Sequence, residues 1–234
     1  MTSSLTNARD LGGLPTATGT TRPGVLFRSE APLAGDALPD LPGWPPAVVL
    51  DLRGSGEGLP EHPLTADGTR VHRIPMLDLV VQAATTDPAS IDLAGLYRRL
   101  LAESAQGLVD VVRLAGAAPG PVLVHCSVGK DRTGVSVALL LALAGVARER
   151  IVADYVLTET NMPGLMRRLS VALNRPEPTE EQLVAMRHLL AAPAEAIEGV
   201  LNALESHECG VRGWLLAHGA TEAEVDRWVE RFVA

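Results

Sequence analysis

Cysteine is scarce in this chain, with Cys126 and Cys209 its two examples among 234 residues. Small secreted domains that depend on disulfide bonds carry many more cysteines, so a disulfide framework is excluded. The first residues lack a basic patch followed by an apolar run, and we therefore expect no signal peptide. Both features fit a reducing compartment. We expect a cytoplasmic protein, although export without a recognisable signal peptide stays open.

Long apolar runs and a positive net charge are lacking as well. No stretch of about 18 uninterrupted apolar residues occurs, so we expect no transmembrane helix and no integral membrane contact. The formal net charge of −8 argues against a general affinity for nucleic acid. A chain that is 47% hydrophobic and 21% charged can bury one sizeable core. We expect a single domain over residues 1–234, and the sequence does not indicate its oligomeric state.

Lysine is almost absent, and its one occurrence falls in the most informative segment. Lys130 is the only lysine, because the other 19 of the 20 basic residues are arginine. It lies in residues 121–134, which read PVLVHCSVGKDRTG. The β-branched run at 122–124 predicts a strand, and the apolar residues after Arg132 predict a helix. Residues 122–145 are therefore expected to form a strand, a short polar loop and a helix.

A loop between a strand and the start of a helix can hold an oxyanion. The first turn of a helix leaves backbone N–H groups without partners, and the helix dipole adds partial positive charge there. Gly129 lets the loop turn tightly, so that successive N–H groups converge. Arg132 adds a planar fork for two phosphate oxygens, and Lys130 adds a point charge. The residues expected to bind phosphate are Ser127, Val128, Gly129, Lys130, Asp131 and Arg132.

Cys126 begins this segment, and we call residues 126–132 the phosphate loop. The positive groups around the sulfur favour the thiolate, which is the nucleophilic form of cysteine. Thr133 can donate a hydrogen bond to the sulfur and ease its departure in a second step. The segment thus predicts nucleophilic attack by Cys126 on a bound phosphoryl group.

These residues resemble a known signature. Cys126, five further residues and Arg132 match the Cys-x5-Arg motif of cysteine-dependent protein tyrosine phosphatases. The longer string HCxxGKDRTG at 125–134 resembles the atypical bacterial tyrosine and phosphoinositide phosphatases, which include mycobacterial enzymes. Further segments look like motifs of that family in the same order, at residues 7–13, 26–30, 51–53 and 151–155.

The resemblance implies a cysteine-phosphatase-like fold and hydrolysis of phosphate monoesters through a phosphocysteine intermediate. It implies a phosphorylated protein or phosphoinositide as substrate, with phosphotyrosine preferred and weaker activity on phosphoserine or phosphothreonine. It also implies that His125 braces the loop through hydrogen bonds. Residues 79–101 would form a short lid, shorter than the helical lid of the mycobacterial members. We expect no cofactor.

The leaving group needs a proton, and two aspartates are candidates for supplying it. Asp78 follows a predicted strand, and by resemblance it matches an aspartate on a loop that can approach the site. Asp131 lies in the phosphate loop itself. The helix dipole and Arg132 would both hold Asp131 ionised, which favours Asp78 as the acid. Asp131 would then orient Arg132 or the attacking water.

The remaining sequence predicts an α/β fold with a small, mostly parallel central sheet flanked by helices and a helix-rich C-terminal half. Residues 1–24 predict an extended arm, and the prolines between 32 and 46 exclude a long regular element there. The resemblance implies a strand at 26–30, and the residues themselves predict strands at 47–52, 70–74 and 122–124, with a loop at 53–68. Helices are expected at 89–117 with a break near Gly107, and at 132–145, 148–157, 160–173, 179–190, 194–206 and 221–232.

Other interpretations stay open on the sequence alone. A sulfurtransferase or an arsenate-reductase-like enzyme also places a cysteine beside an anion loop. A non-catalytic phosphate-binding module is a further alternative, although such modules typically lack the cysteine or the arginine. His207, Cys209 and His218 have a spacing that fits no standard set of metal ligands, so we expect no metal site. Arg167 and Arg168 are interpreted as a solvated helix face.

Overall fold

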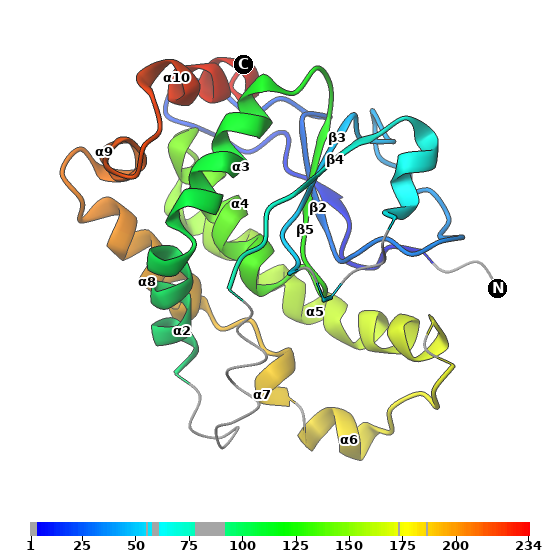
Figure 1. Cartoon of the computed structure of the whole chain (residues 1–234). Helices are drawn as coiled ribbons and strands as arrows, with labels where there is room; N and C mark the ends of the chain where they lie inside the picture. Colours follow the sequence, from blue (N-terminus) through cyan, green and yellow to red (C-terminus); the bar gives the residue numbers. More distant parts are fainter. Residues whose placement is uncertain (1–3, 55, 58–60, 78–91, 173, 186) are drawn as a thin grey trace.

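The computed structural model describes residues 4–234 except 55, 58–60, 78–91, 173 and 186 (Figure 1). A five-stranded sheet lies at its centre, in the order β1-β2-β5-β3-β4. Strand β1 is antiparallel to β2, and the other neighbours are parallel. The strands are β1 (Arg9–Asp10), β2 (Leu26–Ser29), β3 (Val48–Asp51), β4 (Arg70–Arg73) and β5 (Val122–His125). The predicted fold class is confirmed.

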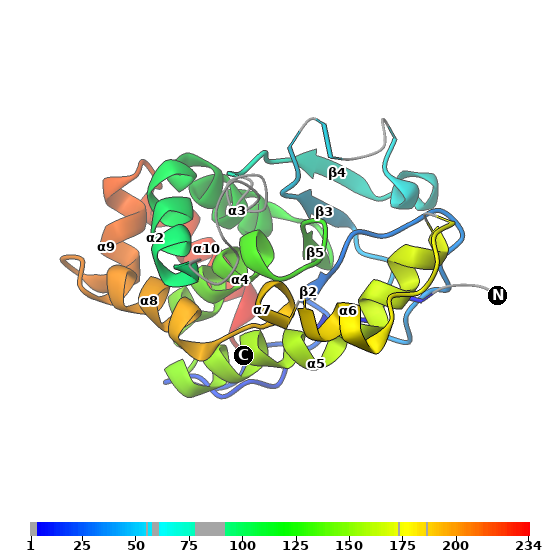
Figure 2. The same cartoon turned by 90° about the horizontal axis from the view of Figure 1, so that it is seen from below.

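Helices cover one face of this sheet more thickly than the other. The helices are η1 (Pro63–Asp67), α2 (Leu93–Glu103), α3 (Ala105–Ala117), α4 (Asp131–Leu143), α5 (Arg148–Ala172), α6 (Glu180–Ala185), α7 (Arg187–Leu190), α8 (Ala194–Glu205), α9 (Gly210–Ala217) and α10 (Glu222–Phe232). Figure 2 shows α2, α3, α4, α8, α9 and α10 gathered on one side of the strands, with α5 running beneath them. Among the described residues, no helix combines the length and the apolar character that crossing a bilayer requires.

The alternation of side chains along the three inner strands divides the core in two. Leu50 and Val124 belong to the large cluster that the helices complete. Val49 and Leu123 point to the other face, where they pack with Leu64 of η1. All residues of β2, β3 and β5 are buried, which is the burial expected for strands inside a mostly parallel sheet. The central strand β5 is thereby fixed on both faces.

Two predicted helix boundaries are wrong. The break in the region 89–117 falls at Ser104, whose hydroxyl accepts a hydrogen bond from the Leu77 amide (3.1 Å). Gly107 lies inside α3 instead, where an added Cβ would sit 3.2 Å from the Ile74 side chain. The glycine therefore serves close packing rather than a helix end.

The segments 148–157 and 160–173 form the single helix α5 rather than two. The helix continues through residues 158 and 159, where Thr158 is fully buried and accepts a hydrogen bond from Arg9 (3.3 Å). Asn161 donates to Asn7 (3.0 Å). These contacts to the N-terminal segment keep polar side chains on the inner face of a continuous helix. Helix α9 and the short helix η1 were not predicted.

Candidate active site

The phosphate loop lies at the carboxyl end of the central strand. Strand β5 ends at His125, α4 begins at Asp131, and β2 and β3 flank β5 on either side. The carboxyl ends of parallel strands are where open α/β sheets bind ligands. Cys126 is 1% exposed at the start of this loop. Helix α4 has no side-chain hydrogen bond at its N-cap, so its first-turn N–H groups face the loop without a capping partner.

Groups outside the loop hold its carbonyl oxygens. His125 Nδ1 bonds to the Cys126 carbonyl (3.0 Å), and the Ala31 amide donates to the Ser127 carbonyl (3.1 Å). Arg28 donates to the Gly129 carbonyl (2.8 Å). The C=O and N–H of a trans peptide point in opposite directions. The N–H groups of residues 127, 128 and 130 therefore face away from these donors. In the described part of the chain the amides of Ser127 and Val128 donate to no residue, which leaves them for an anion.

Gly129 cannot be replaced without moving the loop. Its φ of +72° lies in the left-handed region, which a Cβ disfavours. An added Cβ would lie 2.4 Å from the carbonyl oxygen of Ser29, at the end of strand β2. Backbone atoms cannot yield as a flexible side chain can. The glycine is therefore required both for the turn and for the close approach of β2.

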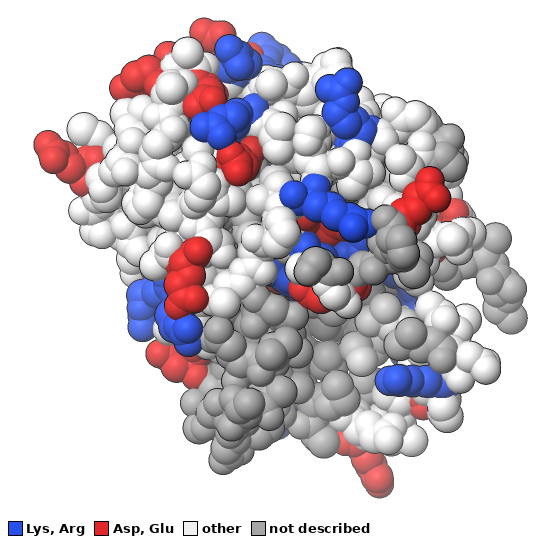
Figure 3. Space-filling view, in the orientation of Figure 1, with Lys and Arg blue, Asp and Glu red and all other residues white. Residues whose placement is uncertain are grey.

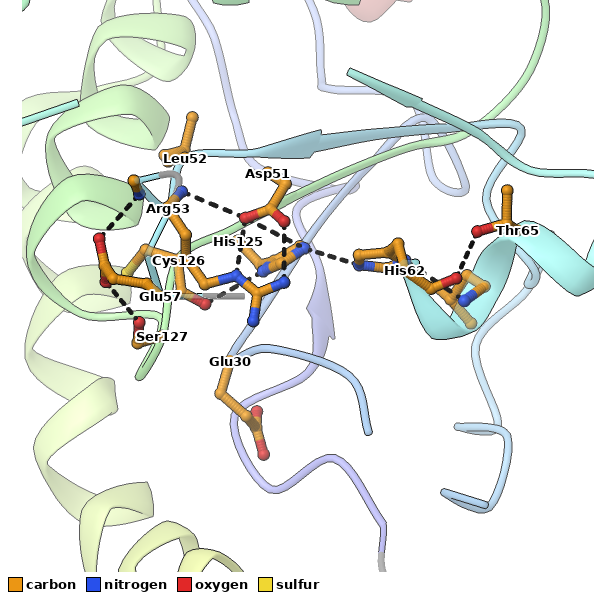
Figure 4. Close-up of polar contacts among 12 residues, drawn as sticks. Glu30, Asp51, Leu52, Arg53, Glu57, His62, Thr65, His125, Cys126 and Ser127 are labelled. Carbon is orange, nitrogen blue, oxygen red and sulfur yellow. Dashed lines mark hydrogen bonds and ion pairs between the residues drawn. The ribbon is translucent and has the colours of Figure 1, made fainter. Parts of the chain in front are cut away.

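Arg132 is held by a carboxylate that sequence reasoning missed. Its guanidinium makes a two-pronged ion pair with Glu57, at 2.5 and 2.6 Å. Ser127 Oγ donates to the same carboxylate (2.9 Å), and so does the Gly54 amide (2.8 Å). Figure 4 shows Glu57 reaching toward Ser127 beside Cys126. Glu57 thus orients the arginine at the mouth of the loop.

The surroundings of Glu57 keep it ionised. Burial raises its pKa, but the hydrogen bonds from Arg132, Gly54 and Ser127 outweigh that effect and lower the pKa to about 2. The residue lies in a glycine-rich loop after β3, and its sequence offered little sign of a role. The one available signal was topological, because β3 neighbours β5 and the loops after parallel strands share one edge.

Asp131 accepts a hydrogen bond from a buried tyrosine. Tyr97 of α2 donates its hydroxyl proton to Asp131 Oδ1 (2.7 Å). The Tyr155 hydroxyl lies 2.8 Å from that of Tyr97, and since Tyr97 has one proton, Tyr155 is the donor of this second bond. Burial, together with Asp131, raises the pKa of Tyr97 well above its usual value. Both tyrosines are at most 1% exposed, so neither can stack on a substrate.

Lys130 and Thr133 are buried in the same region. Lys130 Nζ donates to the Ala191 carbonyl (3.1 Å) and lies 3.6 Å from Asp131 Oδ1. Thr133 Oγ1 has no hydrogen-bond partner among the described residues. An unpartnered buried hydroxyl beside the loop is available to a sulfur anion. Asp78, the other predicted acid, lies outside the described residues.

A charged network supports the loop from behind. Arg28 is 1% exposed. Its guanidinium donates to the Gly129 carbonyl and also pairs with Asp154 of α5, at 2.5 Å from the carboxylate. Arg9 pairs with the other oxygen of Asp154 (2.6 Å), and Asn7 Nδ2 donates to the Gly129 carbonyl (3.3 Å). Burial raises the pKa of Asp154, but the two arginines lower it by more than that, so the pKa lies below its ordinary value. Residues near the N-terminus and from α5 thereby fix one carbonyl of the phosphate loop.

The interpretation of Arg168 as a solvated residue is wrong. Arg167 is exposed, but Arg168 is 6% exposed and pairs with Glu30 and Asp36. Glu30 in turn accepts the backbone amides of Thr6 (2.7 Å) and Asn7 (2.9 Å). Glu30 and Asp36 therefore pair with only one of the two adjacent arginines, and the sequence alone does not reveal which one is buried.

The residues His207, Cys209 and His218 do not meet as a ligand set within the described chain. Three side chains of the kinds that bind metals do converge there, namely Asp51, His62 and His125, with all ligand atoms within 4.8 Å of one another.

In Figure 3 a group of Lys and Arg side chains lies near the middle of one face, with Asp and Glu side chains beside them. Basic groups are thus concentrated locally although the chain as a whole is acidic.

Comparison with known proteins gives a match along the whole chain. The sequence profile described as the tyrosine phosphatase family matches residues 1–234. The triple specificity protein phosphatase PtpB of Mycobacterium tuberculosis is 32% identical, and the alignment covers 94% of each chain. A protein of Cupriavidus necator assigned to the tyrosine-protein phosphatases is 35% identical over 166 residues, which are 65% of this chain and 60% of that protein.

A solved structure is similar in part. The core catalytic domain of the PP-IP phosphatase SIW14 from S. cerevisiae shows 16% sequence identity, covers 80% of this chain and is itself covered to 88%. The TM-score is 0.41, which is too low to support an argument about this chain.

Proposed function

The chain belongs to the tyrosine phosphatase family, and we propose that it hydrolyses phosphate monoesters through a phosphocysteine intermediate on Cys126. One observation carries the proposal. Carbonyls of the phosphate loop are held outward by His125, Ala31 and Arg28, so their amides face a common space at the start of α4. We infer that a tetrahedral dianion binds in that space, beside Cys126 and the Arg132 guanidinium.

In the first step, the Cys126 thiolate attacks phosphorus. A sulfur–phosphorus bond forms while the bond from phosphorus to the leaving oxygen breaks. The loop amides and Arg132 bind the nonbridging oxygens as charge redistributes among them. A general acid delivers a proton to the leaving oxygen, which departs as an alcohol or phenol. Asp78 is our assignment for this acid.

In the second step, water attacks the phosphocysteine. The sulfur–phosphorus bond breaks, and the water proton passes to the carboxylate that served as acid. Thr133 Oγ1, which has no other partner among the described residues, donates to the departing thiolate. Asp131 accepts a hydrogen bond from Tyr97 and positions the loop. Inorganic phosphate and the free thiolate are regenerated.

We propose a broad substrate class. Phosphotyrosine is the preferred substrate, with phosphoinositide turnover and weaker phosphoserine and phosphothreonine turnover. Lys130, the only lysine, lies beside Asp131 and adds a cation near a phosphate in the loop. A relative named for triple specificity supports a broad range. Phosphorylated proteins and phosphoinositides, assayed side by side, decide the order of preference.

The cytoplasm is the proposed location. Cys126 and Cys209 are both free, and an oxidised Cys126 could not attack phosphorus. A compartment with a reducing thiol pool maintains that state.

The mechanism is tested with para-nitrophenyl phosphate and the variant Cys126→Ser. We expect kcat to fall on the order of 10³-fold or more, because the nucleophile is lost while the oxyanion cradle remains. Acid quenching of the wild-type protein during turnover of labelled substrate should trap phosphate on Cys126. Activity that persists in Cys126→Ser, or wild-type protein with no activity on any phosphate monoester, would contradict the proposal.

A further inference from the structure

Two buried histidines form a contact that the proposed chemistry does not yet use. His125 ends strand β5, directly before Cys126, and His62 is the N-cap residue of η1. Their Nε2 atoms lie 3.0 Å apart, and the side chains are 0% and 4% exposed, respectively. Figure 4 shows His62 pointing toward His125 from the side opposite to Glu57. A polar contact this deep must have defined donors and acceptors.

The neighbouring backbone groups determine where each proton lies. The Leu64 amide donates to His62 Nδ1 (3.2 Å), so the proton of neutral His62 is on Nε2. His62 Nε2–H therefore donates to His125 Nε2, which leaves the proton of His125 on Nδ1. His125 Nδ1–H then donates to the Cys126 carbonyl (3.0 Å). The three bonds run in one direction, from the start of η1 to the nucleophile.

Both rings must be neutral for this chain to exist. Burial lowers the pKa of His62 to about 4, and burial likewise lowers the pKa of His125 to about 4. The charged groups that face the pair are Asp51 and Arg53 at the end of β3 and Arg73 of β4. Asp51 opposes the lowering, and Arg53 contributes to it.

The same protons argue against a metal at this cluster. A metal shared by Asp51, His62 and His125 would occupy His62 Nε2 and force its proton onto Nδ1. The protonated Nδ1 would then face the Leu64 N–H, and two donors cannot form a hydrogen bond with each other. Asp51 also makes a two-pronged ion pair with Arg53 (2.9 and 2.8 Å), which neutralises its charge. The cluster is arranged for hydrogen bonding.

We propose that His62 is a positioning residue for catalysis, which fixes the tautomer of His125 and thereby the orientation of the Cys126–Ser127 peptide in the phosphate loop. With His125 Nδ1–H bonded to the Cys126 carbonyl, the Ser127 N–H of that peptide points the opposite way, toward the anion. Without the donor from His62, His125 is free to place its proton on Nε2. Its Nδ1 lone pair would then repel the carbonyl and let the peptide rotate. This inference rests on the proposed phosphatase function.

The first experiment reads the tautomer and does not depend on turnover. Long-range ¹H–¹⁵N correlation spectra of histidine-labelled protein at pH 7.5 distinguish protonated Nδ1 from protonated Nε2. In the wild type we expect His62 protonated on Nε2 and His125 on Nδ1. In His62→Phe, which keeps a flat ring and removes the donor, we expect His125 to show a mixture of tautomers.

The second experiment measures kinetics on para-nitrophenyl phosphate, with active sites titrated by the burst amplitude. We expect His62→Phe to lower kcat about 3- to 10-fold, the equivalent of one hydrogen bond, with a smaller effect on KM. His62→Gln offers an amide donor at a similar reach and should recover most of kcat. Val49→Ala removes buried side-chain volume from the core cluster that also contains Leu64, but it contributes no group to the hydrogen-bond chain, so it should lower stability and leave kcat unchanged.

Defined results overturn the proposal. One is a wild-type His125 protonated on Nε2. Another is a His62→Phe variant whose His125 keeps a single Nδ1–H tautomer and whose kcat per active site stays within twofold of wild type. Zinc that perturbs the His62 and His125 signals together would replace it with a metal site. If the wild type shows no phosphatase activity but the expected tautomers, the proposed function fails while the hydrogen-bond chain stands.

Discussion

At the scale of single residues, the contacts of Asp131 suit a positioning role. Tyr97 donates a hydrogen bond to Asp131 Oδ1, and Lys130 Nζ lies 3.6 Å from the same oxygen. Asp131 is also in the first turn of α4, inside the phosphate loop. A carboxyl group held in this way by neighbouring side chains is better suited to positioning the loop than to reaching the leaving oxygen.

Substrates with different leaving groups distinguish the roles of Asp78 and Asp131. A general acid contributes most when the leaving oxygen is strongly basic. We expect Asp78→Asn to lower kcat about 10²-fold on phenyl phosphate and much less on para-nitrophenyl phosphate, whose leaving group needs little help. Asp131→Asn should lower both rates by a similar factor. Single-turnover rates measure both effects, and an Asp78→Asn variant with wild-type rates on phenyl phosphate would show that the assignment is wrong.

How far these residues were predictable depends on how local their signal is. Cys126 and Arg132 belong to a single motif with five residues between them, and the loop that joins them could be located from sequence. Glu57 could not be found, because its link to Arg132 spans 75 residues and depends on the neighbouring positions of β3 and β5. His62 was likewise missed, since its contact with His125 spans 63 residues. The missing information is tertiary.

At the scale of elements, the phosphate loop is shaped by its neighbours rather than by its own side chains. Strand β2 supplies Arg28 and the close approach at Ser29, and the segment after β2 supplies the Ala31 amide. These groups bind carbonyls and leave amides facing the anion. A short loop cannot hold such an arrangement alone, because clustered N–H dipoles repel one another in the absence of a ligand.

Gly129→Ala tests whether this arrangement is required. The added Cβ would approach the Ser29 carbonyl oxygen to 2.4 Å, so the loop has to shift away from β2. We expect vanadate binding and kcat to fall by more than about 10-fold, since an orientation change in a preorganised anion site is costly. Isothermal titration with vanadate and steady-state kinetics measure the two effects.

Gly219→Ala is the matched control for the backbone cost. Gly219 also has a positive φ, of +96°, but an added Cβ there meets nothing within 4 Å. Both variants should lose about 1–2 kcal/mol of stability from the left-handed conformation, and only Gly129→Ala should lose vanadate binding. Equal vanadate affinity in the two variants would show that β2 does not constrain the loop.

The elements themselves were predictable where they are apolar and regular. β-branched runs gave β3 and β5 to within about a residue or two, the family resemblance gave β2, and the apolar stretch after Arg132 gave α4. Helix α5 was divided in error because its buried polar residues, such as Thr158, resemble an exposed break in the sequence. Polar residues that bond across elements are the general source of such errors.

At the scale of the whole molecule, buried titratable groups make stability depend on pH. The unfolded chain binds protons at ordinary pKa values, about 6.5 for histidine and about 4.3 for glutamate. The folded protein binds these protons only at lower pH, because the pKa of His62 and that of His125 are about 4 and the pKa of Glu57 is about 2. In each interval the unfolded state holds more protons, so the free energy of unfolding falls as the pH falls.

These intervals predict losses of stability in two successive ranges. Between pH 6.5 and 4, the histidine pair should contribute a slope of up to about 1.4 kcal/mol per pH unit for each proton. Between about pH 4.5 and 2 the loss should come in part from Glu57, because the unfolded chain binds this proton while the ion pair with Arg132 keeps the folded carboxylate ionised. Urea unfolding at fixed pH values measures both. Two variants show which group causes each loss, because His62→Gln should reduce the slope in the upper range only, leaving the contribution of His125, and Glu57→Gln should reduce it in the lower range only. A His62→Gln protein whose stability still falls with the wild-type slope between pH 6.5 and 4 would mean that His62 takes up its proton at the same pH in the folded and the unfolded state. The neutral chain from η1 to Cys126 would then be lost below about pH 6.5.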